Sequence, residues 1–264
     1  MPVLPTFSML GHGPTVVLLH GSGGSFRSFA PQVEALASLG FRGVAWSMPG
    51  YGQSVPVEPY SFMGLAASCD HLIEVLMGEA PRRSVALVGH GMGGMLAQEV
   101  AVRRPDLVHQ LVLVATAPAV QPGDSYDHVI GEGLRWLDEG RDMVAMADAL
   151  VPQLVGPAAL PEGVQLARFC QSQVHAATWR RALQAMRGFD RRAALGQIAA
   201  PTLLVAGEQD RVAPPDTLTA MAQAIPAAQL LTLPGAGHLP HLEQPDAFDE
   251  ALIHFLRTAK MRPH

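Results

Sequence analysis

The sequence predicts an α/β protein built around a mostly parallel, doubly wound sheet. Short, near-continuous apolar runs, which are typical of strands buried on both faces, alternate with longer stretches of helical spacing. The 26 glycines and 22 prolines fall between these runs and mark many short connections. Because strands that alternate with helices form parallel sheets covered on both faces, this order predicts the doubly wound arrangement.

Five apolar runs are expected to form buried strands, and a sixth run is weaker. They are residues 15–19, 43–46, 84–88, 111–115 and 202–206, with 229–233 as the weaker run. Helical spacing recurs between them at residues 31–39, 62–77, 93–104, 215–225 and 247–256. Two of these helices have clear stop signals, since Gly78 follows one and Pro105 follows another.

The alternation stops between residues 121 and 195. There, large apolar side chains such as Trp136, Met146 and Trp179 recur at helical intervals, and no strand-like run appears. A helical block inserted between two parallel strands is expected to cover their carboxyl ends, where ligands bind in such folds. The sequence therefore predicts a core of residues 1–120 and 196–264, with a helical cap over residues 121–195.

Size and composition fit one globular domain with room for such an insertion. The chain has 264 residues, of which 48% are hydrophobic and 16% charged, so it has ample material for a core and too little charge for a disordered protein. Its net charge of −5 argues against nucleic acid as a partner, because a nucleic-acid binder needs a basic face. The composition leaves open whether the protein forms a homo-oligomer.

The sequence also predicts a cytoplasmic protein with no membrane partner. Its first residues lack the basic and apolar regions of a secretory signal, and no run of about 20 apolar residues predicts a membrane span. The two cysteines, Cys69 and Cys170, do not make a disulfide framework and fit a reducing compartment.

The most informative segment is Val-Gly-His-Gly-Met-Gly-Gly at residues 88–94, where a predicted strand meets a predicted helix. Small residues two positions before and two positions after a central residue allow a sharp turn that lifts the central side chain above the sheet. This geometry suits a nucleophile. The central residue is Gly91, however, which has no side chain with which to attack a substrate.

Other chemically useful groups follow three predicted strands. Asp210 follows the strand at residues 202–206, and His238 follows the weaker sixth strand, so an acid and a base are expected to meet above the sheet. Ser22 lies in a glycine-rich loop after the first predicted strand. Its backbone N–H, together with that of Met92, is expected to form an oxyanion hole that binds a substrate carbonyl oxygen.

On these motifs the chain resembles the α/β-hydrolase family, specifically its small, cofactor-free esterase and lactonase branch with a helical cap. The resemblance covers nearly the whole chain, and the chain order of turn, acid and histidine is that of the family's catalytic triad. It implies an α/β-hydrolase fold, a catalytic set at positions Gly91, Asp210 and His238, no cofactor, and a small, largely apolar ester or lactone as substrate. The matching segments are Leu19-His20-Gly21, Met48-Pro49-Gly50-Tyr51-Gly52-Gln53-Ser54, residues 88–94, Gly207 to Asp210 with Pro214, and Gly237-His238 with Glu243 and Pro245.

The chain departs from the family pattern at two positions. The usual serine at the tip of the turn is replaced by Gly91, and the acidic or amide residue often found before the Met-Pro-Gly turn is Ser47. Loss of a serine nucleophile alone lowers turnover by roughly 10⁶-fold where the triad acts as a unit. Whether this chain turns over a substrate is therefore the main question that the sequence raises.

Three accounts of Gly91 remain open. In the first, the chain is an engineered knockout, in which an original serine was exchanged for glycine so that substrate binds without turnover. In the second, His238, oriented by Asp210, activates a water for hydrolysis or proton transfer without a covalent intermediate. In the third, the protein is a non-catalytic pseudo-hydrolase that binds a small apolar ligand. A carbon–carbon bond hydrolase of the same fold is a further alternative, although such enzymes typically have Asn and Trp where this chain has His90 and Leu239.

Three further histidines lie near these motifs. His20 and His90 flank the two loops that carry Ser22 and Met92, and we expect their rings to hold these loops by hydrogen bonding. His241, three residues after His238, would suggest a pair of metal ligands, but no third ligand follows at a suitable spacing. No metal site is therefore expected.

Overall fold

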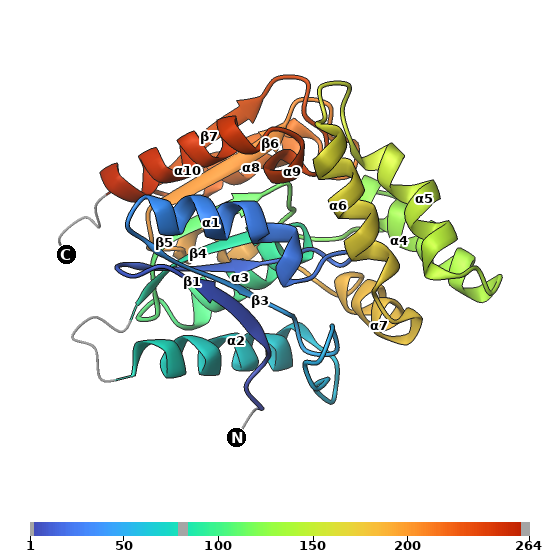
Figure 1. Cartoon of the computed structure of the whole chain (residues 1–264), viewed down its shortest axis with the longest axis horizontal. Helices are drawn as coiled ribbons and strands as arrows, with labels where there is room; N and C mark the ends of the chain where they lie inside the picture. The colour runs from blue at the N-terminus through green and yellow to red at the C-terminus, as the bar shows by residue number, and fades with distance from the viewer. Residues whose placement is uncertain (1–2, 79–83, 260–264) are drawn as a thin grey trace.

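The computed structural model describes residues 3–78 and 84–259, and over these residues it contains a seven-stranded sheet with helices on both faces (Figure 1). The strand order is β1-β3-β2-β4-β5-β6-β7, and all neighbouring strands are parallel except β1, which is antiparallel to β3. The predicted mostly parallel sheet is confirmed. The strands are β1 (Phe7–Leu10), β2 (Thr15–Leu19), β3 (Arg42–Trp46), β4 (Val85–His90), β5 (Val108–Val114), β6 (Thr202–Gly207) and β7 (Ala228–Leu233).

Helices cover the two faces of the sheet in two groups. Helices α1 (Ala30–Ser38) and α10 (Pro245–Thr258) pack on one face, and their apolar side chains form one core cluster. The helices α2 (Phe62–Met77), α3 (Met92–Arg103) and α8 (Pro215–Ala224) contribute to the cluster on the other face. Alternate residues of β2 belong to different clusters, as expected for a strand buried on both faces.

Two strands differ most from the sequence prediction. β1 was not predicted, because its four residues form a half-exposed edge with no continuous apolar run. β5 begins at Val108 rather than at residue 111, since the polar His109 and Gln110 interrupt the apolar pattern. The buried amide of Gln110 donates hydrogen bonds to the carbonyl oxygens of Phe255, Leu256 and Ala259 at the end of α10. A polar residue in this strand thus donates to carbonyl oxygens at the end of the helix, where backbone donors become scarce.

Between β5 and β6 the described chain forms four helices, which we call the cap helices. They lie together on one side of the sheet in Figure 1, and the short 3₁₀ helix η2 (Arg192–Gln197) follows them. Aspartates start two of them, since Asp124 accepts a hydrogen bond from the amide of Asp127, and Asp142 from that of Ala145. The cap helices are α4 (Ser125–Asp138), α5 (Met143–Leu154), α6 (Pro161–Ser172) and α7 (Ala176–Met186).

Among the described residues, no helix has the length and apolar character required to cross a membrane.

Candidate active site

A sharp turn at Gly91 joins β4 to α3. Gly91 has φ 53° and ψ −117°, a left-handed conformation that glycine adopts readily and other residues adopt only with strain. Its N–H donates to the carbonyl of Val114 at 3.0 Å. Its own carbonyl oxygen accepts from the amide of Met95 at 3.1 Å and from the hydroxyl of Thr116 at 2.7 Å. The turn is therefore fixed from three sides.

The small residues around this turn have a steric reason. A Cβ atom on Gly93 would lie 2.2 Å from the carbonyl oxygen of Leu19, and one on Gly89 would lie 2.3 Å from the carbonyl oxygen of Gly93. Both distances are far below van der Waals contact with backbone atoms. The glycines thus allow α3 to start directly against β2 and β4.

His238 and Asp210 form a buried hydrogen-bonded pair. Asp210 follows β6 and His238 follows β7, and Nδ1 of His238 lies 2.9 Å from Oδ2 of Asp210. The other carboxylate oxygen, Oδ1, accepts from the amides of Val212 and Ala213 at 2.8 and 3.0 Å. Because Asp210 acts as the acceptor, Nδ1 carries the hydrogen and Nε2 of the neutral ring offers a lone pair.

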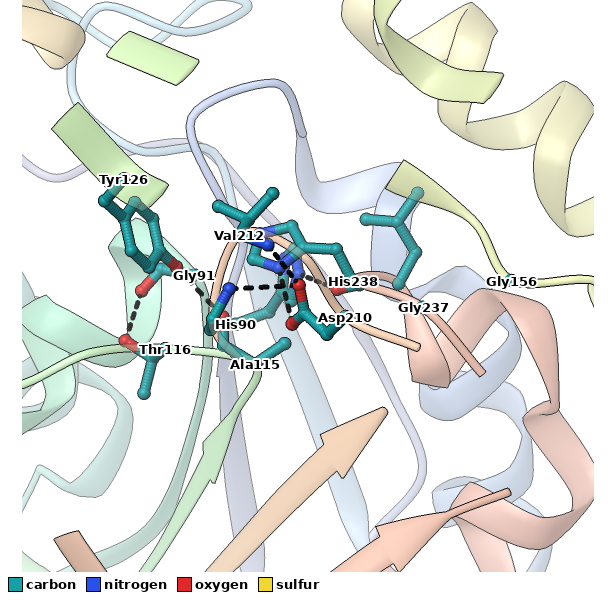
Figure 2. A network of polar contacts seen from close by, with 12 residues as sticks. His90, Gly91, Ala115, Thr116, Tyr126, Gly156, Asp210, Val212, Gly237 and His238 are labelled. Carbon is teal, nitrogen blue, oxygen red and sulfur yellow. Dashed lines mark hydrogen bonds and ion pairs between the residues drawn. The ribbon is translucent and has the colours of Figure 1, made fainter. Parts of the chain in front are cut away.

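The other ring nitrogen of His238, Nε2, lies next to the turn. Figure 2 shows His238, Asp210 and Gly91 in one view. A Cβ atom on Gly91 would be 3.6 Å from Nε2 of His238, 3.8 Å from the Cα of Gly21 and 3.8 Å from the hydroxyl oxygen of Tyr126. The side chain that Gly91 lacks would therefore point between a histidine and a tyrosine. The structure brings the predicted acid, base and turn together.

The loop after β2 lies beside the same turn. Its fold is fixed by the amide of Gly24, which donates to the carbonyl of Gly21 at 2.9 Å, and by the hydroxyl of Tyr51, which donates to the carbonyl of Ser22 at 2.8 Å. Within the described residues, neither the amide of Ser22 nor that of Met92 donates a hydrogen bond. Met92 is the first residue of α3, where the helix itself supplies no acceptor.

A cavity of about 90 Å³ lies between this loop, the turn and the cap helices. Ser22, Gly91, Met92 and His238 all line it, and Asp210 lies behind His238. The cap helices supply a largely apolar wall. Among its members are Val129, Ile130, Leu150, Trp179, Leu183 and Met186.

Two functional candidates were missed by the sequence reasoning. The first is Tyr126 of α4, whose hydroxyl lies next to the turn. It was missed because nothing in the sequence distinguishes a single tyrosine in a helical insertion from a packing residue. The second is Glu243, the last residue of α9 (Pro240–Glu243), which entered the sequence analysis only as part of a segment that matches the family. Its buried carboxylate also accepts hydrogen bonds from the amides of Gly156, Gly237 and Leu239, at 2.7, 2.8 and 2.8 Å.

The other histidines of the site hold loops, as expected. His20 is hydrogen-bonded to the carbonyl of Gly21 at 2.8 Å and accepts from the amide of Met48 at 3.0 Å. His90 donates from Nε2 to the carbonyl of His238 at 2.8 Å. Burial lowers the pKa of His20 to about 4 and holds that of His90 well below its usual value. Both rings are therefore neutral near pH 7.

His241 is buried without hydrogen bonds. Its ring stacks on that of Phe29 with centroids 4.6 Å apart, and neither nitrogen has a hydrogen-bond partner among the described residues. Burial, with a smaller contribution from nearby His238, lowers the pKa of His241 from 6.5 to about 3. Between these two values the unfolded chain binds a proton at His241 that the folded chain does not. The free energy of unfolding therefore falls as the pH falls through this window.

Replacing His241 with leucine is expected to make the protein less sensitive to acid. The change removes the proton uptake on unfolding, which is worth up to about 1.4 kcal/mol per pH unit for one group. Urea denaturation at several pH values between 6.5 and 3 measures the slope of the unfolding free energy against pH. The exposed His12 gives the matched control, His12→Leu. A slope that His241→Leu leaves unchanged would contradict the assignment.

Comparison with known proteins gives consistent matches over most of the chain. A family model described as alpha/beta hydrolase fold matches residues 14–245. The pimeloyl-[acyl-carrier protein] methyl ester esterase of Nitrosospira multiformis is 30% identical over 261 residues, which cover 94% of this chain and 96% of that protein.

Solved structures show the same architecture. The thermophilic esterase from Thermogutta terrifontis has a TM-score of 0.84 at 26% identity, covering 96% of this chain and 92% of that chain. The enol-lactonase from Burkholderia xenovorans LB400 has a TM-score of 0.82 at 26% identity, covering 96% of each chain. The arrangement of sheet and helices is thus shared with these proteins over almost its whole length.

Proposed function

Because the chain belongs to the α/β-hydrolase fold family, with relatives that include esterases and a lactonase, we propose that it hydrolyses a small, largely apolar carboxylic ester or lactone. The reaction proceeds without a covalent enzyme intermediate. A water takes the part of the missing nucleophile, His238 acts as its general base, and the amides of Ser22 and Met92 bind the carbonyl oxygen.

One distance supports this proposal above all others. Nε2 of His238 lies 3.6 Å from the position of a Cβ atom on Gly91. A serine at this position would place its hydroxyl within hydrogen-bonding reach of Nε2, and glycine leaves room there for a water to make the same contact. The base and the expected oxyanion donors line one cavity, so that water would face a carbonyl carbon bound in it.

The proposed reaction has two steps. The water oxygen attacks the carbonyl carbon while Nε2 of His238 takes one of its protons, and the carbonyl oxygen becomes an oxyanion held by the two amides. The carboxylate of Asp210 stabilises the imidazolium that forms. The bond from carbon to the leaving oxygen then breaks, and the imidazolium returns the proton to that oxygen. The products are a carboxylic acid and an alcohol, which remain one molecule when the substrate is a lactone.

The cavity supports the size and character of the substrate. A volume of about 90 Å³ suits a short acyl or lactone group, and the apolar side chains of the cap helices suit one with little charge. The two cysteines are free and buried, which fits a reducing compartment, so the proposed location is the cytoplasm.

His238→Ala is the direct test of this function. We expect the unaltered protein to hydrolyse p-nitrophenyl acetate and butyrate above the buffer rate, and the variant to lose at least about 10²-fold of that excess rate, because general-base catalysis contributes this much. His128→Ala, which changes an exposed histidine on α4, is the matched control.

Two results would count against the proposal. Turnover that persists in His238→Ala would show that His238 is not the general base. Absence of turnover by the unaltered protein, together with saturable binding of an ester, would support a non-catalytic ligand-binding role instead. Hydroxylamine should intercept no acyl-enzyme, since none forms.

A further inference from the structure

The hydroxyl of Tyr126 occupies a specific place in the cavity wall. Tyr126 lies in the first turn of α4, and its side chain is buried. Of the three atoms that lie closest to a Cβ position on Gly91, two are polar: Nε2 of His238 at 3.6 Å and Oη of Tyr126 at 3.8 Å. Figure 2 shows Gly91 with the tyrosine ring close to it. The other α4 residues that line the cavity, Val129 and Ile130, are apolar.

The hydrogen of this hydroxyl is already engaged in a hydrogen bond. It is donated to the carbonyl of Ala115 at 3.0 Å. Burial and the charge of Asp210 raise the pKa of Tyr126 well above its usual value, so the phenol keeps this hydrogen near neutral pH. The oxygen therefore has only lone pairs to offer to a group above Gly91.

The acceptor carbonyl belongs to an unusual backbone position. Ala115 has φ 45°, and among the described residues it is the only one other than glycine with a positive φ. This conformation is costly for alanine and persists where surrounding contacts hold it. The hydrogen bond from Tyr126 is one such contact, so the tyrosine and the end of β5 fix each other.

Two hydrogen-bond acceptors flank the space above Gly91, and together they would define the orientation of a water bound there. Nε2 of His238 accepts one hydrogen of that water, and Oη of Tyr126 accepts the other. The lone pairs of the water are then directed into the cavity, towards a bound carbonyl carbon. We propose that Tyr126 binds and orients the hydrolytic water, a role that rests on the proposed function and that a serine at position 91 would make unnecessary.

The test compares Tyr126→Phe in two backgrounds. For an ester with a good leaving group, kcat/KM reports attack by water in the unaltered protein and attack by serine in Gly91→Ser. Loss of one hydrogen bond to the attacking water is expected to lower kcat/KM about 3- to 10-fold in the unaltered protein. In Gly91→Ser, where no water takes part in acylation, the change is expected to stay within about twofold.

Controls separate this role from a structural one. Tyr126→Phe also removes a donor from the carbonyl of Ala115, and thermal unfolding should report the same loss of stability in both backgrounds. Tyr60→Phe is the matched substitution, because its hydroxyl contacts Sδ of Met48 and does not line the cavity. We expect Tyr60→Phe to leave kcat/KM unchanged in both backgrounds.

The outcomes are distinct. An equal fall of kcat/KM in both backgrounds would show that Tyr126 only supports the fold of the site, and would overturn the inference. No fall in either background would overturn it as well. If the unaltered protein has no turnover that depends on His238, the proposed function itself fails and the inference falls with it. A fall of kcat/KM that is confined to the unaltered protein would support both the proposed function and the role of Tyr126.

Discussion

Gly91→Ser is expected to raise the hydrolysis of short p-nitrophenyl esters by roughly 10⁴-fold or more, because loss of a serine nucleophile costs up to about 10⁶-fold. The Cβ atom of the new side chain would lie 3.6 Å from Nε2 of His238, so its hydroxyl reaches the base that would activate it. Steady-state kinetics measure the gain. A fluorophosphonate should label the variant once per chain and leave the unaltered protein unlabelled.

The same substitution is expected to cost stability. Gly91 has φ 53°, and a residue with a side chain is strained there by about 1 to 3 kcal/mol. Denaturant unfolding should show this loss. Gly91→Ala is the matched control, since it introduces the strain without the hydroxyl and should lower stability without raising the rate. A serine variant that gains no activity would mean that the turn, the base and the amides do not form a working catalytic site.

Asp210→Asn is expected to lower kcat/KM by about 10⁴-fold in the Gly91→Ser background. The carbonyl oxygen of the asparagine can still accept from the amides of Val212 and Ala213. Its NH₂ group then faces Nδ1 of His238, where the carboxylate accepts a hydrogen bond at 2.9 Å. The ring is forced to carry its hydrogen on Nε2, and a nitrogen that carries a hydrogen cannot accept the proton of the nucleophile.

Glu208→Gln is the matched control for this prediction. Glu208 lies in the same loop, is exposed, and accepts from the amide of Gly235 rather than from His238. It should leave kcat/KM within about twofold, as is usual for an exposed side chain remote from the reacting atoms. If Asp210→Asn is as mild as Glu208→Gln while both variants stay folded, Asp210 does not orient the base.

The parallel sheet could be predicted from the sequence, because strands that are buried on both faces appear there as continuous apolar runs. The run at residues 202–206 became β6 (Thr202–Gly207), and that at 15–19 became β2 with the same limits. Edge and polar positions were harder to predict. β1 is short and half exposed, and the start of β5 is hidden by Gln110, whose partners lie on α10.

The site residues that directly follow a strand could be predicted, because the end of the strand determines where they lie. Asp210 and His238 each follow a strand, so the convergence of parallel strands placed them correctly beside each other. Tyr126 was not predictable in this way, because its approach to Gly91 depends on how α4 packs across the end of the sheet. The hydrogen bonds that Glu243 accepts could not be predicted for a similar reason, because one of the three donors, Gly156, follows α5 in the chain.

The carboxylate of Glu243 has a mechanical consequence for how a substrate enters. It joins the segment after α5 to both neighbours of His238, and the amide of His238 adds a further bond to the carbonyl of Leu154 at 2.6 Å. This corner of the cap is therefore clamped to the loop that carries the base. If it swung outward, it would pull the imidazole out of line. A substrate that reaches His238 without displacing its ring would therefore have to enter elsewhere along the rim of the cavity.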